Sequence, residues 1–284
     1  GCTGPSELGT KENPVKIFFS PSSNIGVISE SSKDLVKFLE KETGIFFEIK
    51  VPTSYISVVE AFGSKRADIG IISSFGYLLA HQKYGVKAGL RIVRYGKDFY
   101  RGQIVARADS GIKTLKDLNG KSFAFTDPSS ISGYIFPLKM LMENNIVLKN
   151  KIFAARHDNV INMVYQKQVE AGATFNSDPS PDGAITDARS LVISQFPDVT
   201  NKIKILALTE NIPNDPVVFR SDLSDLIRNS FSNALKKYLN TPEGNKTFSK
   251  IYNFQGVVPA TDSDYDGLRQ IISKINLDLK GLVQ

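Results

Sequence analysis

Short apolar runs alternate along this chain with longer segments in which apolar residues recur every three or four positions. The short runs indicate buried strands and the longer segments indicate amphipathic helices, so their alternation predicts an α/β protein with mainly parallel sheets. In the first part of the chain, strands are expected at 15–19, 45–51 and 67–73, and helices at 31–43 and 55–65. The first helix is expected to begin at Ser31 or Ser32 as a cap and to end at Gly44.

The same order of elements restarts near residue 121. Strands expected at 121–126, 151–155 and 170–174 alternate with helices at 132–144 and 159–167. Extended segments at 101–107 and 204–208 are placed to cross between the two halves, and helices at 222–239, 242–251 and 262–275 are expected to pack back on the first half.

This order predicts two α/β lobes joined by two crossover strands, with a hinge and a cleft between them. We expect a flexible tether at 1–14, a first lobe formed by 15–103 with 208–284, and a second lobe formed by 104–207.

The composition is that of an ordinary globular protein. Of 284 residues, 41% are hydrophobic and 23% are charged, and 35 Lys and Arg against 29 Asp and Glu leave a net charge of +6. The basic residues are scattered and no nucleic-acid-reading motif accompanies them, which argues against a nucleic-acid partner. No run approaches the roughly 20 apolar residues of a membrane-spanning helix, so we expect contact with a membrane only through an anchor.

Cys2 is the single cysteine of the sequence and lies in a segment rich in Gly, Pro and polar residues. A small residue, a cysteine and a polar stretch resemble the mature start of a bacterial lipoprotein, which predicts lipidation of Cys2 and a periplasmic or extracytoplasmic location. The alternative is an incidental cysteine after a cloning remnant.

The segment 123–137 carries the most informative chemistry. Its apolar strand runs into Asp127 and Pro128 and then into three serines and a glycine at an expected helix start, Ser129, Ser130, Ser132 and Gly133. A helix start offers unpaired backbone N–H groups and the positive end of the helix dipole, and hydroxyls add further donors. Such a site can hold a tetrahedral oxyanion. Plain N-capping is the alternative, and it accounts well for one serine but not for three with a glycine.

This segment resembles the Asp-Pro-x-Ser-Thr-Ser-Gly-x-x-x-Pro signature of periplasmic phosphonate-binding proteins, the solute-binding components of bacterial ABC importers. Further similar stretches are Tyr-x-x-x-x-Glu-Ala at 55–61, Tyr-Arg-Gly at 100–102, Leu-Lys-Asp-Leu-Asn-Gly-Lys at 115–121, His-Asp at 157–158 and Glu-Ala-Gly-Ala at 170–173. The resemblance implies a type II periplasmic-binding-protein fold. It also implies that the chain captures a small phosphorus oxyanion, such as phosphite, methylphosphonate or a similar phosphonate, in an interlobe cleft and delivers it to the transporter permease.

The family resemblance further implies a ligand held by residues 129–133, here called the serine turn, and by its amides. A histidine of the same lobe and tyrosines of the opposite lobe complete the contacts. The matching residues are Ser130, Ser132, His157, Tyr55 and Tyr100, with Ser129 as a further candidate. Ile131 stands where the family usually has threonine, so one hydroxyl donor is lost. Ile131 either forms an apolar wall that suits a P–H or P–CH₃ group and disfavours a fourth oxygen, or points into the core.

Three titratable side chains complete the candidate site. An anion beside His157 should raise its pKa and favour binding at mildly acidic pH, whereas the alternative is a helix-start histidine bonded to local backbone. Relatives that bind aminoalkylphosphonates hold the amine with acidic groups, and Asp178 and Asp215 are candidates for that role. Both acids have prolines nearby, so they also fit ordinary turns.

Other functions fit the sequence less well. It has no Gly-x-Ser-x-Gly elbow, and the chain neighbours His157 and Asp158 cannot be assumed to form a catalytic pair, so hydrolase activity is the weaker alternative and we expect no enzyme. No residues have metal-ligand spacing, so we expect neither metal nor cofactor. Phosphate, sulfate and aminoalkylphosphonates stay open as alternative ligands, and docking to a permease favours a monomer.

Overall fold

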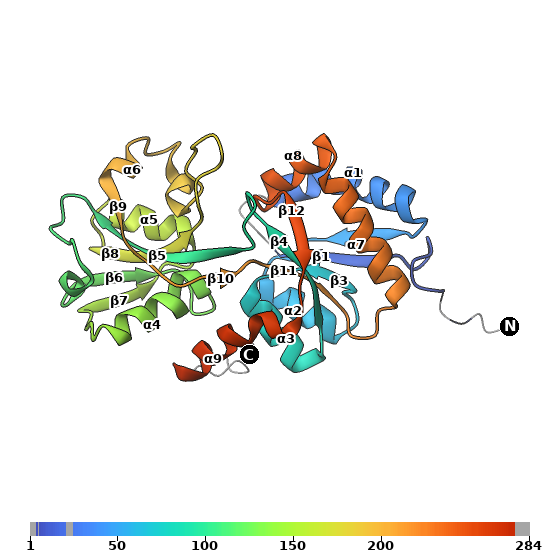
Figure 1. Cartoon of the computed structure of the whole chain (residues 1–284), viewed down its shortest axis with the longest axis horizontal. Coiled ribbons are helices and arrows are strands. Elements are labelled where there is room, and N and C mark those ends of the chain that lie inside the picture. Colours follow the sequence, from blue (N-terminus) through green and yellow to red (C-terminus); the bar gives the residue numbers. More distant parts are fainter. Residues whose placement is uncertain (1–3, 5, 21–24, 276–284) are drawn as a thin grey trace. The chain divides into compact units, whose positions relative to one another are not determined.

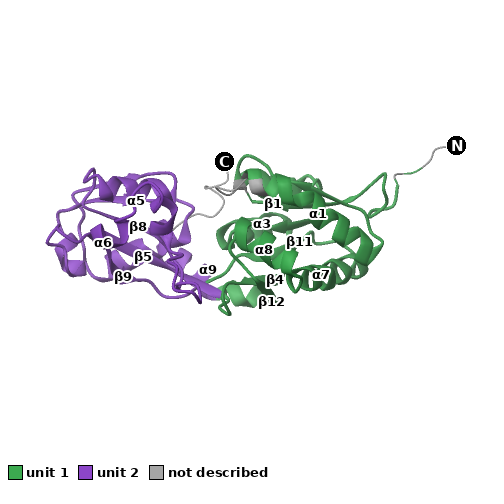
Figure 2. Cartoon of the chain, turned by 90° about the horizontal axis from the view of Figure 1, so that it is seen from above, with its two compact units in different colours: residues 1–98, 213–266, 279–284 green, residues 99–212, 267–278 purple. Residues whose placement is uncertain are grey.

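The computed structural model describes residue 4, residues 6–20 and residues 25–275, without the side chains of Ile25, Val27 and Tyr55. Contacts within the chain separate the described residues into two compact units (Figure 2). The first unit contains the chain up to Asp98 together with Pro213–Asp266. The second contains Phe99–Ile212 and the chain from Gly267 to the last described residue.

The first unit is built around a six-stranded sheet (Figure 1). Its strands are β1 (Val15–Phe19), β2 (Phe47–Lys50), β3 (Ile69–Ile71), β4 (Lys87–Val93), β11 (Pro216–Phe219) and β12 (Gly256–Pro259). They lie in the order β12-β4-β11-β3-β1-β2. β1 pairs in parallel with β2 and β3, whereas β11 pairs antiparallel with both β3 and β4, and β12 antiparallel with β4.

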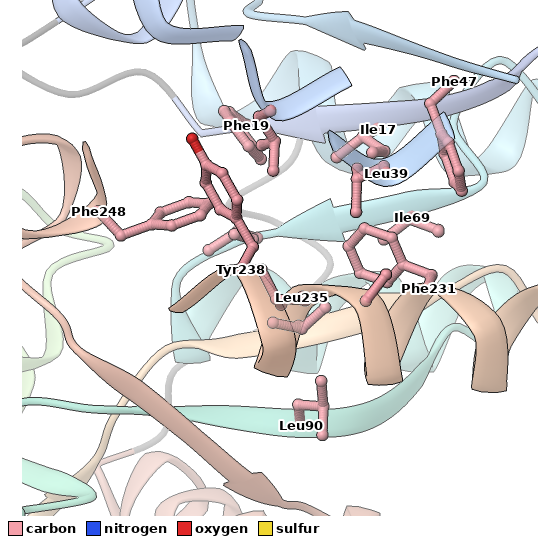
Figure 3. Close-up of a cluster of buried hydrophobic side chains, with 14 of the residues drawn as sticks. Ile17, Phe19, Leu39, Phe47, Ile69, Leu90, Phe231, Leu235, Tyr238 and Phe248 are labelled. Atoms are coloured by element: carbon pink, nitrogen blue, oxygen red, sulfur yellow. The ribbon is translucent and has the colours of Figure 1, made fainter. Parts of the chain in front are cut away.

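Two groups of helices pack on opposite faces of this sheet. One group is α1 (Ile25–Thr43), α7 (Asp225–Leu239) and α8 (Pro242–Ile251), and the other is α2 (Tyr55–Gly63) and α3 (Ser74–Tyr84). Because side chains alternate along a strand, Phe19 faces the first group while Gly70 lies against Phe62 of α2. Figure 3 shows how Phe19 and Leu39 join Phe231 of α7 in one apolar cluster of the first unit.

The second unit contains a second mixed sheet. Its strands are β5 (Phe99–Arg107), β6 (Ser122–Phe125), β7 (Asn150–Phe153), β8 (Ala171–Asn176), β9 (Ile203–Leu208) and β10 (Ile212–Pro213), in the order β10-β5-β8-β6-β7 with β9 beside β5. β6 pairs in parallel with β7 and β8, whereas β5 pairs antiparallel with β8 and β9.

Short helices connect and cover the strands of the second unit. They are the 3-10 turns η1 (Leu115–Leu118) and η3 (Ala188–Val192), the π-helical turn η2 (Ile131–Ile135), and the helices α4 (Phe136–Glu143), α5 (His157–Tyr165) and α6 (Val199–Lys202). Helix α9 (Asp266–Lys274) follows the 3-10 turn η4 (Asp262–Tyr265) of the first unit.

The sequence pattern located most elements, and two were confirmed to the residue, β1 and α8. Both predicted sheets are mixed: β11 and β12 in the first sheet and β5 in the second pair antiparallel with their neighbours. The predicted cap at Ser31 or Ser32 was wrong. Helix α1 begins at Ile25, and the two serines lie within it as partly buried residues.

The boundaries between the units differ from the predicted ones. They lie after Asp98 and Ile212, whereas 103 and 207 were predicted, because β5 begins at Phe99 and its ladder with β8 already includes Arg101. Most of α9 is grouped with the second unit, although 208–284 was predicted in the first lobe.

The predicted tether 1–14 is partly folded. Leu8 packs against the apolar cluster of the first unit, and the backbone N–H of Gly9 donates to Asn13 O at 2.8 Å.

Candidate functional site

The serine turn follows β6 and is fixed to that strand by backbone hydrogen bonds. Thr126 N donates to Gly133 O at 3.0 Å, and Ser130 N donates to Asp127 O at 2.9 Å. Ile135 N then donates to Ser130 O at 3.0 Å, five residues back, which gives the turn its π-helical form. The chain therefore closes a compact loop at the carboxyl end of β6.

Two serines of the turn already make local hydrogen bonds. Ser130 Oγ accepts from Gly133 N at 2.9 Å, so Ser130 is the N-cap of η2. Ser129 N donates to Asp127 Oδ1 at 2.8 Å, and its hydroxyl also donates to that oxygen. The N-capping interpretation is thus correct for Ser130, and Ser129 is bonded to Asp127.

Four hydrogen-bond donors of the turn remain available. Within the part of the chain that the structure describes, the backbone N–H groups of Ile131 and Ser132 have no acceptor, and neither has the Ser132 hydroxyl. The Ser130 hydroxyl can also donate, because its oxygen only accepts in the bond to Gly133. Adjacent N–H groups at a helix start, joined by hydroxyls, form a site that suits an oxyanion.

Ile131 is buried in the second unit, where only 3% of the residue is exposed. Its backbone N–H is kept as a donor, so the replacement of the family's threonine removes a hydroxyl from the turn without removing an amide.

His157 lies next to the serine turn and is bonded to it through Thr126. It is the first residue of α5, and its Nδ1 is 3.3 Å from Thr126 Oγ1. The ring also contacts Phe175 edge-on, with the ring centres 4.9 Å apart. Burial lowers the pKa of His157 to about 4, and the carboxylates of Asp158 and Asp127 only partly oppose this shift. The imidazole of the ligand-free site is therefore neutral at neutral pH.

The site lies where three parallel strands end. Thr126 follows β6, Asn176 ends β8, and His157 comes four residues after the end of β7. The carboxyl ends of parallel strands meet at one edge of a sheet, which is where open α/β sheets bind ligands. Ser130, Ser132 and His157 all lie in the second unit.

A buried polar network beneath this edge was not predicted from the sequence. Gln103 Nε2 donates to Thr174 Oγ1 at 3.1 Å and to Asp187 Oδ1 at 3.2 Å, and Asn176 Nδ2 donates to Gln103 Oε1 at 2.9 Å. Asp187 is also paired with Arg189 at 3.0 Å, and both side chains are buried. The network joins β5, β8 and η3, and so fixes the strand ends that carry the site.

The remaining candidates lie in different places. Tyr100 is in β5 and belongs to the second unit with Ser130 and His157, which corrects the prediction that it lies in the opposite lobe. Tyr55 begins α2 in the first unit, but its side chain lies outside the described residues, as does Cys2.

The two acidic candidates have contrasting surroundings. Asp178 is exposed in the loop after β8, where its backbone oxygen accepts from Thr186 Oγ1 at 2.6 Å. Asp215 lies in the first unit just before β11, and burial raises its pKa to about 6 although Arg94 acts in the opposite direction. A buried carboxyl with a raised pKa is a candidate functional residue.

The described residues contain neither a metal-binding cluster nor a membrane-spanning helix. They contain no group of three or more His, Cys, Asp or Glu side chains placed to hold a metal ion. No helix in the same ranges has the length and apolar character needed to span a bilayer.

Similarity to known proteins extends over most of the chain. The family model described as "ABC transporter, phosphonate, periplasmic substrate-binding protein" matches residues 17–265. The "Phosphate-import protein PhnD" of Mycolicibacterium smegmatis is 29% identical over 269 residues, which are 88% of this chain and 82% of the relative. The "Phosphonates-binding periplasmic protein" of Escherichia coli is 23% identical over 241 residues, or 80% of this chain and 69% of the relative.

A solved structure shows the same fold. PhnD1 from Prochlorococcus marinus, in complex with methylphosphonate, matches with a TM-score of 0.74 at 17% identity, covering 92% of this chain and 98% of that one. The type II periplasmic-binding-protein fold is confirmed by this likeness and by the two α/β units.

Proposed function

Because this chain belongs to the periplasmic substrate-binding proteins of phosphonate ABC transporters, we propose that its ligand is phosphite, methylphosphonate or a similar small phosphonate. The observation that carries the proposal is the set of unpaired donors in the serine turn, directly beside His157. The backbone N–H groups of Ile131 and Ser132 and the hydroxyls of Ser130 and Ser132 would bind the ligand oxygens.

Position 131 favours a phosphorus oxyanion with one apolar substituent. We propose that the Ile131 side chain lies against a P–H or P–CH₃ group. A fourth oxygen at the same place would lose its hydrogen bonds with water and gain no donor, at a cost of about 1 to 3 kcal/mol. Phosphate and sulfate, the alternative ligands, both carry that fourth oxygen.

The ligand is proposed to bind between the two units, with Tyr100 adding a contact from β5 and Tyr55 a contact from the first unit. Capture would begin at the serine turn, and movement of the first unit toward the bound anion would then complete the site. The permease would recognise this closed state. We further propose that the protein acts as a monomer, without enzyme activity, and that Cys2 anchors it to a membrane.

An aminoalkylphosphonate is the second candidate ligand, favoured by the raised pKa of Asp215. A bound ammonium group would stabilise the carboxylate form and so offset the burial cost of this side chain. Asp178 is exposed in the other unit and is a weaker candidate for the same role.

Isothermal titration with phosphite, methylphosphonate, 2-aminoethylphosphonate, phosphate and sulfate tests these proposals. We expect tight binding of phosphite or methylphosphonate and weak binding of phosphate and sulfate. Preference for the amino compound would instead support the role of Asp215, and no binding of any of the five would contradict the proposed function.

Ser132→Ala tests the site itself. The Ser132 hydroxyl has no partner within the described part of the chain, so its loss should leave the free energy of unfolding nearly unchanged. It should weaken ligand binding about 10- to 100-fold, because a hydrogen bond to a charged group contributes about 1.5 to 3 kcal/mol. Ser129→Ala is the matched control, because that hydroxyl is bonded to Asp127. Equal affinities of Ser132→Ala and the unmodified protein would place the ligand elsewhere.

A further inference from the structure

The hydroxyl of Thr126 connects His157 to the sheet and fixes the hydrogen-bonding role of the ring. Thr126 Oγ1 lies 3.0 Å from Ala173 O and 3.3 Å from His157 Nδ1. A carbonyl oxygen can only accept and a hydroxyl has one hydrogen, so Thr126 donates to Ala173. With Thr126 only 3% exposed, water offers no alternative partner. Thr126 Oγ1 can therefore only accept from the ring, which places a hydrogen on His157 Nδ1.

This arrangement is held rigidly by the serine turn. Thr126 N donates to Gly133 O at 3.0 Å, and a β-carbon at position 133 would overlap the Thr126 hydroxyl. The hydroxyl is thus enclosed between Gly133 of the turn and Ala173 of β8, and it cannot turn away from the imidazole.

The other ring nitrogen must then be an acceptor. A neutral imidazole carries one hydrogen, and if this is on Nδ1 then Nε2 of His157 has a lone pair. The charged groups near the ring are Asp158 of α5, which pairs with Arg156 at 2.8 Å, and Asp127 after β6, while β8 contributes the uncharged Phe175. The burial of the ring outweighs the attraction of these two carboxylates and keeps it neutral.

We propose that His157 selects for an oxyanion that carries one proton into the complex, so that a P–OH group of the ligand donates to Nε2. The inference rests on the proposed function, in that His157 contacts the ligand. Phosphorus oxyanions of this kind lose their second proton near neutral pH, as phosphate monoesters do at a pKa of about 6. Sulfate and sulfonates have no such proton, so the lone pair of Nε2 would face an oxygen lone pair. Thr126 is the positioning residue for this selection.

The proton count gives each ligand class its own pH profile. A phosphonate monoanion brings the shared proton with it, so its affinity should stay constant up to its second pKa and then fall about tenfold per pH unit. A sulfonate can bind only if His157 takes a proton from water. Its affinity should be lower at neutral pH and rise about tenfold for each pH unit below it, down to the pKa of the ring near 4.

The tautomer can be measured before any ligand is added. The sequence has two histidines, so ring nitrogen chemical shifts are assigned by comparison with a His81→Asn variant. We expect a neutral ring protonated on Nδ1 at about pH 7. A hydrogen on Nε2 of His157 in the ligand-free protein would overturn the inference while leaving the proposed function intact.

Methylphosphonate and methanesulfonate form the matched ligand pair, because they have the same shape and differ in the titratable proton. Titration between about pH 5 and pH 8, in buffers of different ionisation enthalpy, should give the two profiles above and an uptake of close to one proton for the sulfonate. Parallel profiles for the two ligands would contradict the inference. Failure of both ligands and of phosphite to bind would instead contradict the proposed function.

Substitutions of His157 and Thr126 distinguish selection between the two ligands from a purely structural role of these residues. His157→Gln offers an amide that can donate or accept, so the ratio of methylphosphonate to methanesulfonate affinity should fall at least about tenfold. Thr126→Val removes the acceptor of the Nδ1 hydrogen, so His157 can carry its hydrogen on either ring nitrogen. This variant should reduce the same affinity ratio and flatten the pH profile of the sulfonate. Thr126→Ser keeps the hydroxyl and should restore both the ratio and the profile. A loss of affinity for both ligands in equal proportion would show only structural support.

Discussion

Gly102 lies directly against the backbone of Ser132. A β-carbon at position 102 would come within 2.5 Å of Ser132 O and 3.0 Å of Thr209 Cγ2. The serine turn and β5 therefore touch at a point where a side chain has no room.

Gly102→Ala should displace the turn and weaken ligand binding about tenfold or more, because the donors of Ile131 and Ser132 would move together. Binding is measured by titration, and stability by denaturant unfolding. Gly267→Ala is the matched control, since a β-carbon there has open space. Unchanged binding by a folded Gly102→Ala protein would show that the position of the turn tolerates this shift.

Ile131→Thr should change which phosphorus oxyanion is preferred. A hydroxyl at this position would offer a donor to a fourth oxygen, so affinity for phosphate relative to methylphosphonate should rise about 5- to 100-fold. Ile131→Val is the control, because it keeps an apolar, β-branched side chain. If Ile131→Thr lowers stability with no change in this ratio, the side chain belongs to the core rather than to the binding site.

Asp215→Asn should stabilise the ligand-free protein at neutral pH. The native pKa of about 6 lies above the usual 3.8, so the folded state retains this proton longer than the unfolded chain does. The stability linked to this group is therefore complete below about pH 4 and is lost as pH rises through 6. The neutral amide should raise the free energy of unfolding by about 1 to 2 kcal/mol at pH 7 and by much less near pH 4.

Denaturant unfolding at the two pH values measures this difference, with Glu12→Gln as the control for an exposed acid of the same unit. The same variant should bind 2-aminoethylphosphonate less tightly if Asp215 holds an amine. A gain in stability that is equal at both pH values would contradict the assigned titration.

Asp187→Asn should destabilise the second unit strongly. The Arg189 guanidinium would stay buried with its charge unpaired, which costs about 3 to 5 kcal/mol. Lys237→Gln removes one member of an exposed pair with Glu42, 2.9 Å apart, and should change stability by less than about 1 kcal/mol. Similar effects of the two substitutions on denaturant unfolding would contradict a structural role for the buried network.

The sequence pattern predicted those features that are determined by a few neighbouring residues. The strand that becomes β1, the stop at Gly44 and the donors of the serine turn all follow from a few adjacent residues, and the family resemblance was confirmed. The pattern did not predict α3 and β4. Helix α3 is buried along Ser74–Ala80, so it lacks the alternation of apolar and polar positions that marks a surface helix.

Features that depend on the register of the sheet could not be predicted from the sequence. Gln103 and Asp187 are 84 positions apart, and nothing near either residue indicates that they are hydrogen-bonded. The unit to which Tyr100 belongs depends in the same way on the pairing of β5 with β8. The sequence shows Thr126 between the strand and Asp127. Its role could not be predicted, because it depends on the bond to Ala173 O in a different strand.

The serine turn is anchored to β6 through main-chain groups, such as Thr126 N with Gly133 O and Ser130 N with Asp127 O. Exchanges of the side chain at position 131 leave these anchors unchanged. A replacement here can therefore alter the lining of the turn while the main-chain hydrogen bonds that present its donors stay the same.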